Sequence, residues 1–400
     1  MINKKGMDAF WPSIGAVIIM YITVIIGGYF PVDLTIILGI SESSALITWI
    51  ILVLALNAWL ASSLPVQTLL QPRDYINSHQ LLVAMALVGF GVIAAHPTVV
   101  APAINFAPRG APPIWPFLFV VIACGAISGF HSLVSSGTSS KQCDSESDSL
   151  FIGYGSMLME GALSVLVIIA VAAGIGLGLP GEGGEVFTGV AAFKQHYASW
   201  DTANGLSDKI GAFIHGSANM MTSYGIPVKI ALAIMAVFIV SFAATTLDSA
   251  TRIQRYVIVE LSNAYRFRPF ARRQTATLFA IIVAYILAFY DGTGKGALKL
   301  WPLFGSVNQL LAGLALLVTT IYLARRRINI AYTGIPMVFM VFVTGWATTL
   351  NIQKFHATSN WLLFIIGMAV FILEVWMIFE SAVVLKDVYG KGKGLQEVLS

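Results

Sequence analysis

Charged residues are scarce in this sequence, and their scarcity excludes most soluble folds. Asp, Glu, Lys and Arg make up 10% of the 400 residues, against roughly 25% in an ordinary soluble domain. Hydrophobic residues make up 57%, and the mean hydropathy is +0.82. Such a chain cannot cover a surface in water with polar groups, so we expect the bilayer to be its solvent.

Cysteine and nucleotide-binding motifs are also nearly absent. Cys124 and Cys143 fit neither a disulfide framework nor a zinc spacing. No Walker sequence and no Gly-rich phosphate loop after a strand occurs, which argues against an ATP-driven pump. We predict no cofactor, no metal and no nucleic-acid partner. We also predict no enzyme activity, because His131 with Ser135, the nearest base–nucleophile pair, has no orienting acid close in sequence.

Long apolar runs are what the sequence has instead. A spanning helix needs about 20 mostly apolar residues, and continuous runs favour helices over a barrel. The chain is therefore predicted to be all-α, a polytopic bundle of about ten membrane helices, some broken, forming one transmembrane domain over 1–400. The predicted spans are 10–30, 46–70, 81–100, 114–134, 150–179, 227–250, 273–290, 299–323, 331–350 and 361–385.

Basic residues set the orientation of these spans. The "RFRPFARR" loop at 266–273 and the "ARRR" turn at 324–327 both lie inside if two spans separate them. We therefore expect both termini to be cytoplasmic. The Gly-rich stretch 181–226 is then an extracytoplasmic loop. Its weakly apolar piece "IGAFIHGSANMM" fits a surface helix and a re-entrant segment equally well.

A cluster of hydroxyl groups ends the fourth run, in "SGFHSLVSSGTSSKQ" at 128–142. On a helix, Ser128, His131 and Ser135 share one face. A helix that frays near Ser136 and Thr138 would place carbonyl and hydroxyl oxygens together, a combination that binds sodium or a carboxylate. The alternative is a polar helix end whose serines bond back to their own helix.

Three further polar positions lie within apolar runs. Glu160 sits about ten residues into the fifth run, where a carboxylate usually faces a cavity or a partner. It is a candidate proton carrier or an inter-helix hydrogen-bond partner. Asn308 and Gln309 enter the eighth run, where amides either join helices or contact a solute.

The segment "TTLDSATRIQRYVIVE" at 245–260 holds an acid and a base four residues apart. Asp248 and Arg252 have the favourable order for a helical ion pair, which a solute carboxylate would compete to break. Thr245 shares a face with Asp248 and adds an oxygen ligand. The alternative is a neutralised pair at the cytoplasmic end of the span.

Six motifs in order resemble the carbon starvation protein A family of membrane transporters. They are "QPRDY", "HPTVVAPAINF", "PFLFVVIACGAISGFHSLVSSGTSSKQ", "FIGYGSMLMEG", "TTLDSATRIQRYVIVE" and "LWPLFGSVNQLLAGLALL". The resemblance extends over nearly all of 45–325. The resemblance implies an inverted-repeat fold of the amino acid–polyamine–organocation type in the cell inner membrane. It implies secondary import of pyruvate or short peptides, coupled to protons or sodium.

The same resemblance makes transport the favoured role for Ser128 to Thr138, Glu160 and Asp248, and the other polar positions fall within its motifs without an assigned role. The polar positions within the motifs are Ser128, His131, Ser135, Ser136, Thr138, Glu160, Thr245, Asp248, Arg252, Asn308 and Gln309. One departure is that the family pattern begins before Met1. We therefore expect a fragment, half of a split gene or a short form. The alternative function is a non-transporting membrane subunit that needs a separate N-terminal half or forms a homo-oligomer.

Overall fold

The computed structural model of this protein describes residues 10–39, 43–106, 108–181, 183–203 and 205–398. The chain forms two compact units, each built from two separate stretches of sequence. Unit 1 comprises Met1–Ala111 and Ile152–Ile286, and unit 2 comprises Pro112–Phe151 and Leu287–Ser400.

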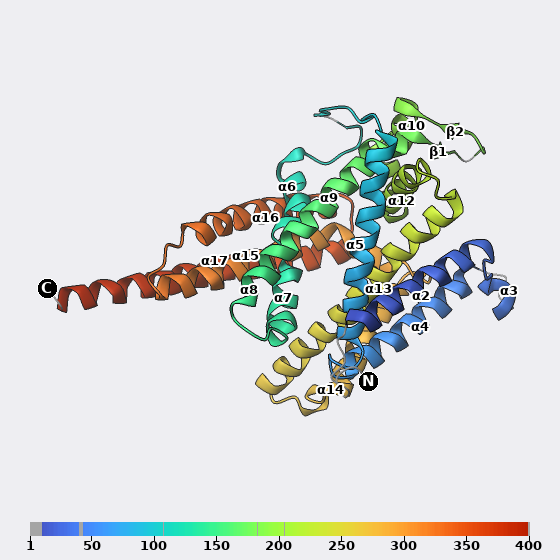
Figure 1. The fold of residues 1–400 in the computed structure, drawn as a ribbon. Coiled ribbons are helices and arrows are strands. Elements are labelled where there is room, and N and C mark those ends of the chain that lie inside the picture. Colours follow the sequence, from blue (N-terminus) through green and yellow to red (C-terminus); the bar gives the residue numbers. More distant parts are fainter. Residues whose placement is uncertain (1–9, 40–42, 107, 182, 204, 399–400) are drawn as a thin grey trace. The chain divides into compact units, whose positions relative to one another are not determined.

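The described residues are almost entirely helical, as the apolar runs predict (Figure 1). The helices of unit 1 are α2 (Phe10–Tyr29), α3 (Leu34–Leu38), α4 (Ser43–Ser63), α5 (Leu70–Ala95), α9 (Ser156–Ala172), α10 (Gly189–His196), α11 (Trp200–Ala203), α12 (Leu206–Thr222), α13 (Val228–Ala264) and α14 (Arg273–Ala288). Those of unit 2 are α6 (Ile114–Ala126), α7 (Gly129–Gly137), α8 (Asp148–Leu150), α15 (Trp301–Arg325), α16 (Ala331–Ala357) and α17 (Trp361–Val398).

Short elements join these helices. One antiparallel pair of strands, β1 (Leu179–Pro180) and β2 (Val186–Phe187), forms a hairpin. The remaining short elements are the π-helix η2 (Phe151–Gly155) and the 3-10 turns η1 (Ser139–Lys141), η3 (Gly174–Leu177), η4 (Arg268–Phe270) and η5 (Gly296–Leu300).

Nine segments of the described chain are long and apolar enough to cross a membrane, which confirms a polytopic membrane helix bundle. The seventh predicted span, 273–290, is the shorter helix α14. Some predicted bounds were wrong. Helix α5 begins at Leu70, not near 81, and α13 continues to Ala264. The start of α5 was hard to recognise in the sequence because its first turns contain the polar residues Asn77 and Gln80, which are buried inside unit 1.

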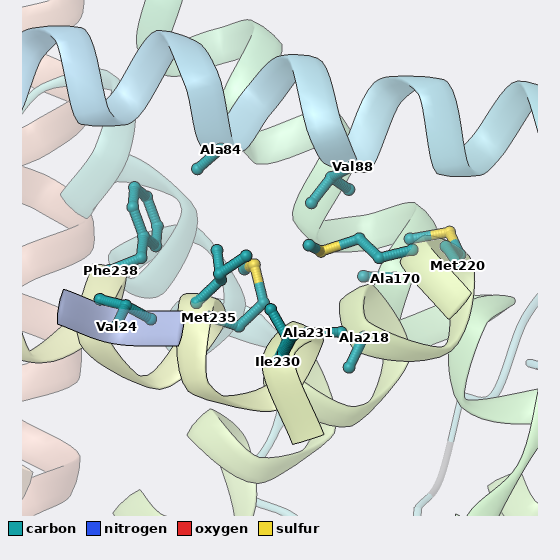
Figure 2. Packing of buried hydrophobic residues seen from close by; sticks show 12 residues of the cluster. Val24, Ala84, Val88, Ala170, Ala218, Met220, Ile230, Ala231, Met235 and Phe238 are labelled. Atoms are coloured by element: carbon teal, nitrogen blue, oxygen red, sulfur yellow. The ribbon is translucent and has the colours of Figure 1, made fainter. Parts of the chain in front are cut away.

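The core of unit 1 surrounds α12 and α13 (Figure 2). Met220 of α12 and Met235 and Phe238 of α13 pack there with Val88 of α5. The unbranched methionine side chains fill irregular gaps between helices that cross at different angles. Helix α12 thus lies in the interior of its unit, although its sequence is only weakly apolar.

Glycine lets α12 approach its neighbours closely. A Cβ on Gly216 would collide with the carbonyl oxygen of Ala170 in α9, and one on Gly91 of α5 would lie 2.8 Å from the Met220 backbone. The amide of Asn219 then donates to the carbonyls of Gly174 (3.0 Å) and Gly178 (2.6 Å), where α9 gives way to η3. Small residues and one amide therefore join α9 to α12.

Unit 2 is built around α15. This helix packs against α6, α7, α16 and α17. Leu303 of α15, Phe355 of α16 and Leu363 of α17 form a buried cluster at one end of the unit. Val120 of α6 packs against Val343 and Ala347 of α16 further along.

Candidate functional site

A buried acid lies at the junction of three helices in unit 1. Asp248 of α13 is fully buried. Its carboxylate forms an ion pair with the guanidinium of Arg73 in α5 and accepts hydrogen bonds from the amide of Asn57 in α4 at 3.2 and 3.3 Å. The hydroxyl of Ser62 donates to the Asp248 carbonyl at 3.0 Å. A carboxylate so far from water needs these partners to stay ionised.

Arg73 is shared between two carboxylates. Its Nη2 also contacts Asp74 at 3.1 Å and the Thr245 carbonyl at 3.4 Å. The Arg73 side chain keeps 23% of its surface exposed, whereas Asp248 keeps none. The Arg73 side chain is therefore the partly exposed member of the pair.

The polar network continues along α5 and α13. The amide of Asn77 donates to the Thr245 hydroxyl at 3.4 Å and accepts from the Ser241 hydroxyl at 3.0 Å. Thr245 is thus placed next to the acid, on the face of α13 that its spacing predicts.

The predicted pair between Asp248 and Arg252 was wrong. Arg252 is buried, and its Nη2 donates to the carbonyls of Ala61 (3.0 Å) and Leu64 (2.6 Å). These carbonyls end α4, just before Pro65, where a helix leaves its last acceptors without partners inside the helix. The cation therefore caps a helix end, and an arginine 175 positions away in sequence takes its place beside Asp248.

Glu160 also belongs to unit 1. It lies on α9 with its side chain partly exposed, and its backbone carbonyl accepts a hydrogen bond from the Ser164 hydroxyl at 2.9 Å. Nothing in this arrangement decides between a proton carrier and an inter-helix contact, so its role stays a prediction.

A second polar cluster lies in unit 2, where the chain breaks between α6 and α7. Ile127 and Ser128 leave helical geometry, and the Asn308 amide of α15 fills the break. Its Oδ1 accepts from the Phe130 backbone N–H at 2.8 Å, and its Nδ2 lies 3.1 Å from the Ser128 hydroxyl. This side chain therefore caps the first turn of α7.

Two more contacts hold the break in place. Gln309 donates from Nε2 to the Val120 carbonyl of α6 at 3.0 Å. Gly129 lies so close to α15 that a Cβ there would collide with the Asn308 carbonyl. Both predicted amides thus join helices, which was one of their two predicted roles.

The rest of the hydroxyl cluster lies along α7 and just beyond it. The helix ends at Gly137 with Thr138 as its C-cap. The hydroxyls of Ser132 and Ser136 bond back to Gly129 and Leu133 carbonyls at 2.6 and 3.3 Å. His131 and Ser135 are exposed, whereas Ser128 is buried against Asn308. Hydrogen bonds within α7 therefore engage the hydroxyls of Ser132 and Ser136, whereas the side chains of His131 and Ser135 are accessible.

The predicted site residues thus fall into two groups. Thr245, Asp248, Arg252 and Glu160 belong to unit 1, and Ser128 to Thr138 with Asn308 and Gln309 belong to unit 2. The structure brings together Thr245 with Asp248 through Arg73, and Ser128 with Asn308. The sequence did not identify Asn57, Arg73 and Asn77 as site residues. The "QPRDY" motif, with its charged pair inside a run of membrane helices, was the available signal.

Metal ligands do not gather in the described part of the chain, where no group of three or more His, Cys, Asp or Glu side chains is placed to hold an ion. The polar clusters instead offer carboxylate, guanidinium, amide and hydroxyl groups within apolar helices. Such groups recognise a small polar solute or carry protons.

Apolar helices that enclose small polar clusters define a polytopic membrane protein of the helical-bundle class. Within that class, the chain belongs to the carbon starvation protein CstA family, whose model matches residues 1–179 and 183–347. The match confirms the family that the six motifs predict, and it extends beyond 45–325 at both ends.

Curated relatives agree with this assignment. The chain is 29% identical over 358 residues to the pyruvate/proton symporter BtsT of Escherichia coli K12, covering 74% of this chain and 49% of the relative. It is 32% identical over 341 residues to the peptide transporter CstA of Mycobacterium tuberculosis H37Rv, covering 71% and 43%.

A third relative gives the longest coverage of these three. The chain is 30% identical over 386 residues to the peptide transporter CstA of Helicobacter pylori 26695, covering 85% and 55%. The chain thus spans about half the length of the curated relatives it matches. No solved structure matches it significantly.

Proposed function

We propose that this chain belongs to a secondary active transporter that imports a small carboxylated solute, pyruvate or a short peptide, across the cell inner membrane. A proton or sodium gradient drives the import. The names of the relatives support transport of these solutes, and the pyruvate/proton symporter among them favours the proton.

The observation that carries this proposal is the ion pair between Asp248 and Arg73. A fully buried carboxylate is paired with the guanidinium of a partly exposed arginine side chain. The Arg73 fork matches the geometry of a carboxylate, so a solute carboxylate competes with Asp248 for the same donors.

Protonation of Asp248 decides whether Arg73 binds Asp248 or the solute carboxylate. When Asp248 gains a proton it no longer holds Arg73 by charge, and the guanidinium is released to bind the solute anion. When the solute leaves, Arg73 returns to Asp248 and the proton is expelled. Binding of the proton and of the solute thereby favour each other, which is the linkage that a symporter needs.

The remaining predicted residues have supporting roles in this proposal. The carbonyl of Thr245 accepts a hydrogen bond from Arg73 and so orients the guanidinium. Arg252 donates to the carbonyls that end α4 and so holds this helix end beside Asp248. In unit 2, Asn308 and Gln309 hold the α6–α7 break. His131, Ser135, Ser136 and Thr138 then offer polar contacts to the solute or cation, and Glu160 is a further proton carrier in unit 1.

Uptake into proteoliposomes tests the proposal. Purified protein is assayed with labelled pyruvate and with a dipeptide, each under an imposed pH gradient and under an imposed sodium gradient. Asp248→Asn and Arg73→Gln are expected to abolish gradient-driven uptake, whereas Asp291→Asn, an exposed acid outside the spans, retains it. Unchanged uptake in both cluster variants would remove the ion pair from the mechanism.

A second candidate function is a membrane subunit that works only with another polypeptide. It is supported by exposed polar side chains on otherwise apolar segments, namely His131, Ser135 and Ser136. Polar groups at such positions favour a partner over lipid. Co-purification with a neighbouring gene product, and uptake that requires it, would favour this candidate. Uptake by the chain alone would exclude it.

A further inference from the structure

Unit 2 contains a second buried acid that no motif and no ion pair accounts for. Glu374 of α17 is 1% exposed. Neither of its carboxylate oxygens has a hydrogen-bond partner among the described residues. It also lies beyond residues 183–347, where the family match ends. Glu374 therefore differs from Asp248, whose partners account for its burial.

A glycine creates the space that Glu374 occupies. A Cβ on Gly345 of α16 would lie 3.1 Å from Oε1 of Glu374, closer than a side chain normally packs. The carboxyl group therefore lies directly on the backbone of α16. This contact places the acid between α16 and α17.

The helix register defines what surrounds the acid. Asn351 of α16 donates to Ser306 of α15 at 3.3 Å, and Gly313 of α15 lies against Val341 of α16. The two helices are antiparallel, so Gln309 of α15 lies at the level of Gly345.

No titratable or charged side chain of α15 or α16 lies at that level within the described chain. The groups present are Gln309, Gly313, Thr344, Gly345 and Thr348. Tyr322 and Arg325 of α15, and Tyr332, Lys354 and His356 of α16, lie toward the ends of their helices. Lys354 is nine residues from Gly345, about 13 Å along the axis. Neither helix therefore presents a counter-charge at the level of Glu374 among the described residues.

Three other buried oxygens at this level also have no hydrogen-bond partner in the described part of the chain. They are Oε1 of Gln309 and the hydroxyls of Thr344 and Thr348. The Gln309 Oε1 can only accept a hydrogen bond, which suits the O–H donor of a neutral carboxylic acid, whereas the two threonine hydroxyls can accept or donate. An ionised Glu374, buried without a hydrogen-bond partner among the described residues, would bear the full cost of burying an unpaired charge.

We propose that Glu374 is a proton-binding site of unit 2, which holds its proton in the packed arrangement of α16 and α17. The site binds the proton whether or not the chain transports. Its use as a coupling site in solute import rests on the proposed function above.

Labelling with dicyclohexylcarbodiimide tests the site directly. This apolar reagent adds a protonated carboxyl group across one of its C=N bonds and rearranges to a stable N-acylurea, which peptide mass spectrometry locates. Full-length protein in lipid vesicles is labelled between about pH 5 and about pH 9, the range in which buried carboxyl groups titrate. Glu374 is expected to react at neutral pH, and its labelling to fall several-fold at the alkaline end.

The controls use residues of the same chain. Glu146, exposed in the loop before α8, is expected to stay unlabelled at neutral pH. Glu374→Gln keeps the shape of the side chain and is expected to fold while losing the label, whereas Glu380→Gln, at an exposed position of α17, keeps it. Absence of labelling at Glu374 across the range would overturn the proposal. Labelling of Glu374 that does not change with pH and is blocked by sodium would also overturn the proposal, and would indicate a sodium site.

Uptake separates this proposal from the function of the whole protein. If Glu374 couples, Glu374→Gln loses accumulation driven by a pH gradient, whereas Glu380→Gln keeps it. Wild-type protein that takes up no solute contradicts the proposed function, and the labelling result still decides the proton site. Uptake by Glu374→Gln with an unchanged response to the pH gradient would contradict the coupling role.

Discussion

At the scale of single residues, the most informative feature is the sharing of Arg73 between Asp74 and Asp248. Burying a charge is tolerated only when its partner stays in place, and removing one partner leaves the other without compensation. The stability of unit 1 and the proposed competition for Arg73 therefore depend on the same contact.

Replacing the members of this pair is predicted to be non-additive. Arg73→Gln leaves Asp248 buried without its cation and is expected to lower the free energy of unfolding by about 3 kcal/mol. The double variant Arg73→Gln/Asp248→Asn removes both charges and is expected to lose clearly less than the sum of the single variants. Denaturant titration of the detergent-solubilised protein measures the three values, and additive losses would show that the pair is not coupled.

His215 of α12, outside the candidate spans, gives a pH-dependent prediction. Burial lowers the pKa of His215, and the neighbouring charge of His196 lowers it further. The unfolded chain has a histidine pKa of about 6.5. As the pH falls below that value the unfolded state takes up a proton that the folded state still refuses, so the folded protein loses stability.

Thermal unfolding of wild type and His215→Gln between about pH 5 and about pH 8 measures this effect. The wild type is expected to lose more of its unfolding temperature on acidification than the variant. Curves that remain parallel would contradict the prediction.

At the scale of elements, the close contact between α9 and α12 depends on glycine. Gly216→Ala places a methyl group against the Ala170 carbonyl and is expected to destabilise the protein by about 1–3 kcal/mol, the usual cost of overpacking. Gly161→Ala, in the same α9 but with open space around it, is the matched control. It is expected to be neutral or to stabilise by up to about 1 kcal/mol, since alanine favours a helix. Equal effects in a thermal shift assay would exclude the contact as the cause.

Most of the elements could be predicted from hydropathy because each spanning helix must satisfy its own backbone hydrogen bonds. The partners of the polar residues could not. The pattern Asp248–Arg252 favours a local pair, but the choice of Arg73 depends on how α5 packs against α13, which spacing within one helix does not encode. Helix α12 was missed as a core element for the same reason, because its glycines bury it by close backbone approach and not by apolar content.

At the scale of the whole molecule, the arrangement of the chain across the membrane is still a prediction. Helix α14 has 16 residues and is about 24 Å long, shorter than a bilayer core of about 30 Å. The loop around 266–272 and the turn at 325–327 lie on the same side only if α14 spans.

Cysteine labelling tests this arrangement in intact cells. With native Cys143 present, a membrane-impermeant maleimide is expected to leave the protein unlabelled, because the loop after α7 is predicted to be cytoplasmic. In a Cys124→Ser/Cys143→Ser background, Thr293→Cys and Ser359→Cys are expected to react from outside, and Arg268→Cys is expected to be protected. Reaction of Arg268→Cys from outside would place the basic loop on the wrong side and contradict the predicted orientation.

The amide of Asn219 donates hydrogen bonds to the carbonyls of Gly174 and Gly178. Gly216, one turn before Asn219, packs directly against the backbone of Ala170. For α12 to slide along α9, these hydrogen bonds and this backbone contact would have to break at the same time. In any rocking motion of unit 1, α9 and α12 would therefore move together as one rigid body, and the hinge would lie elsewhere in the chain.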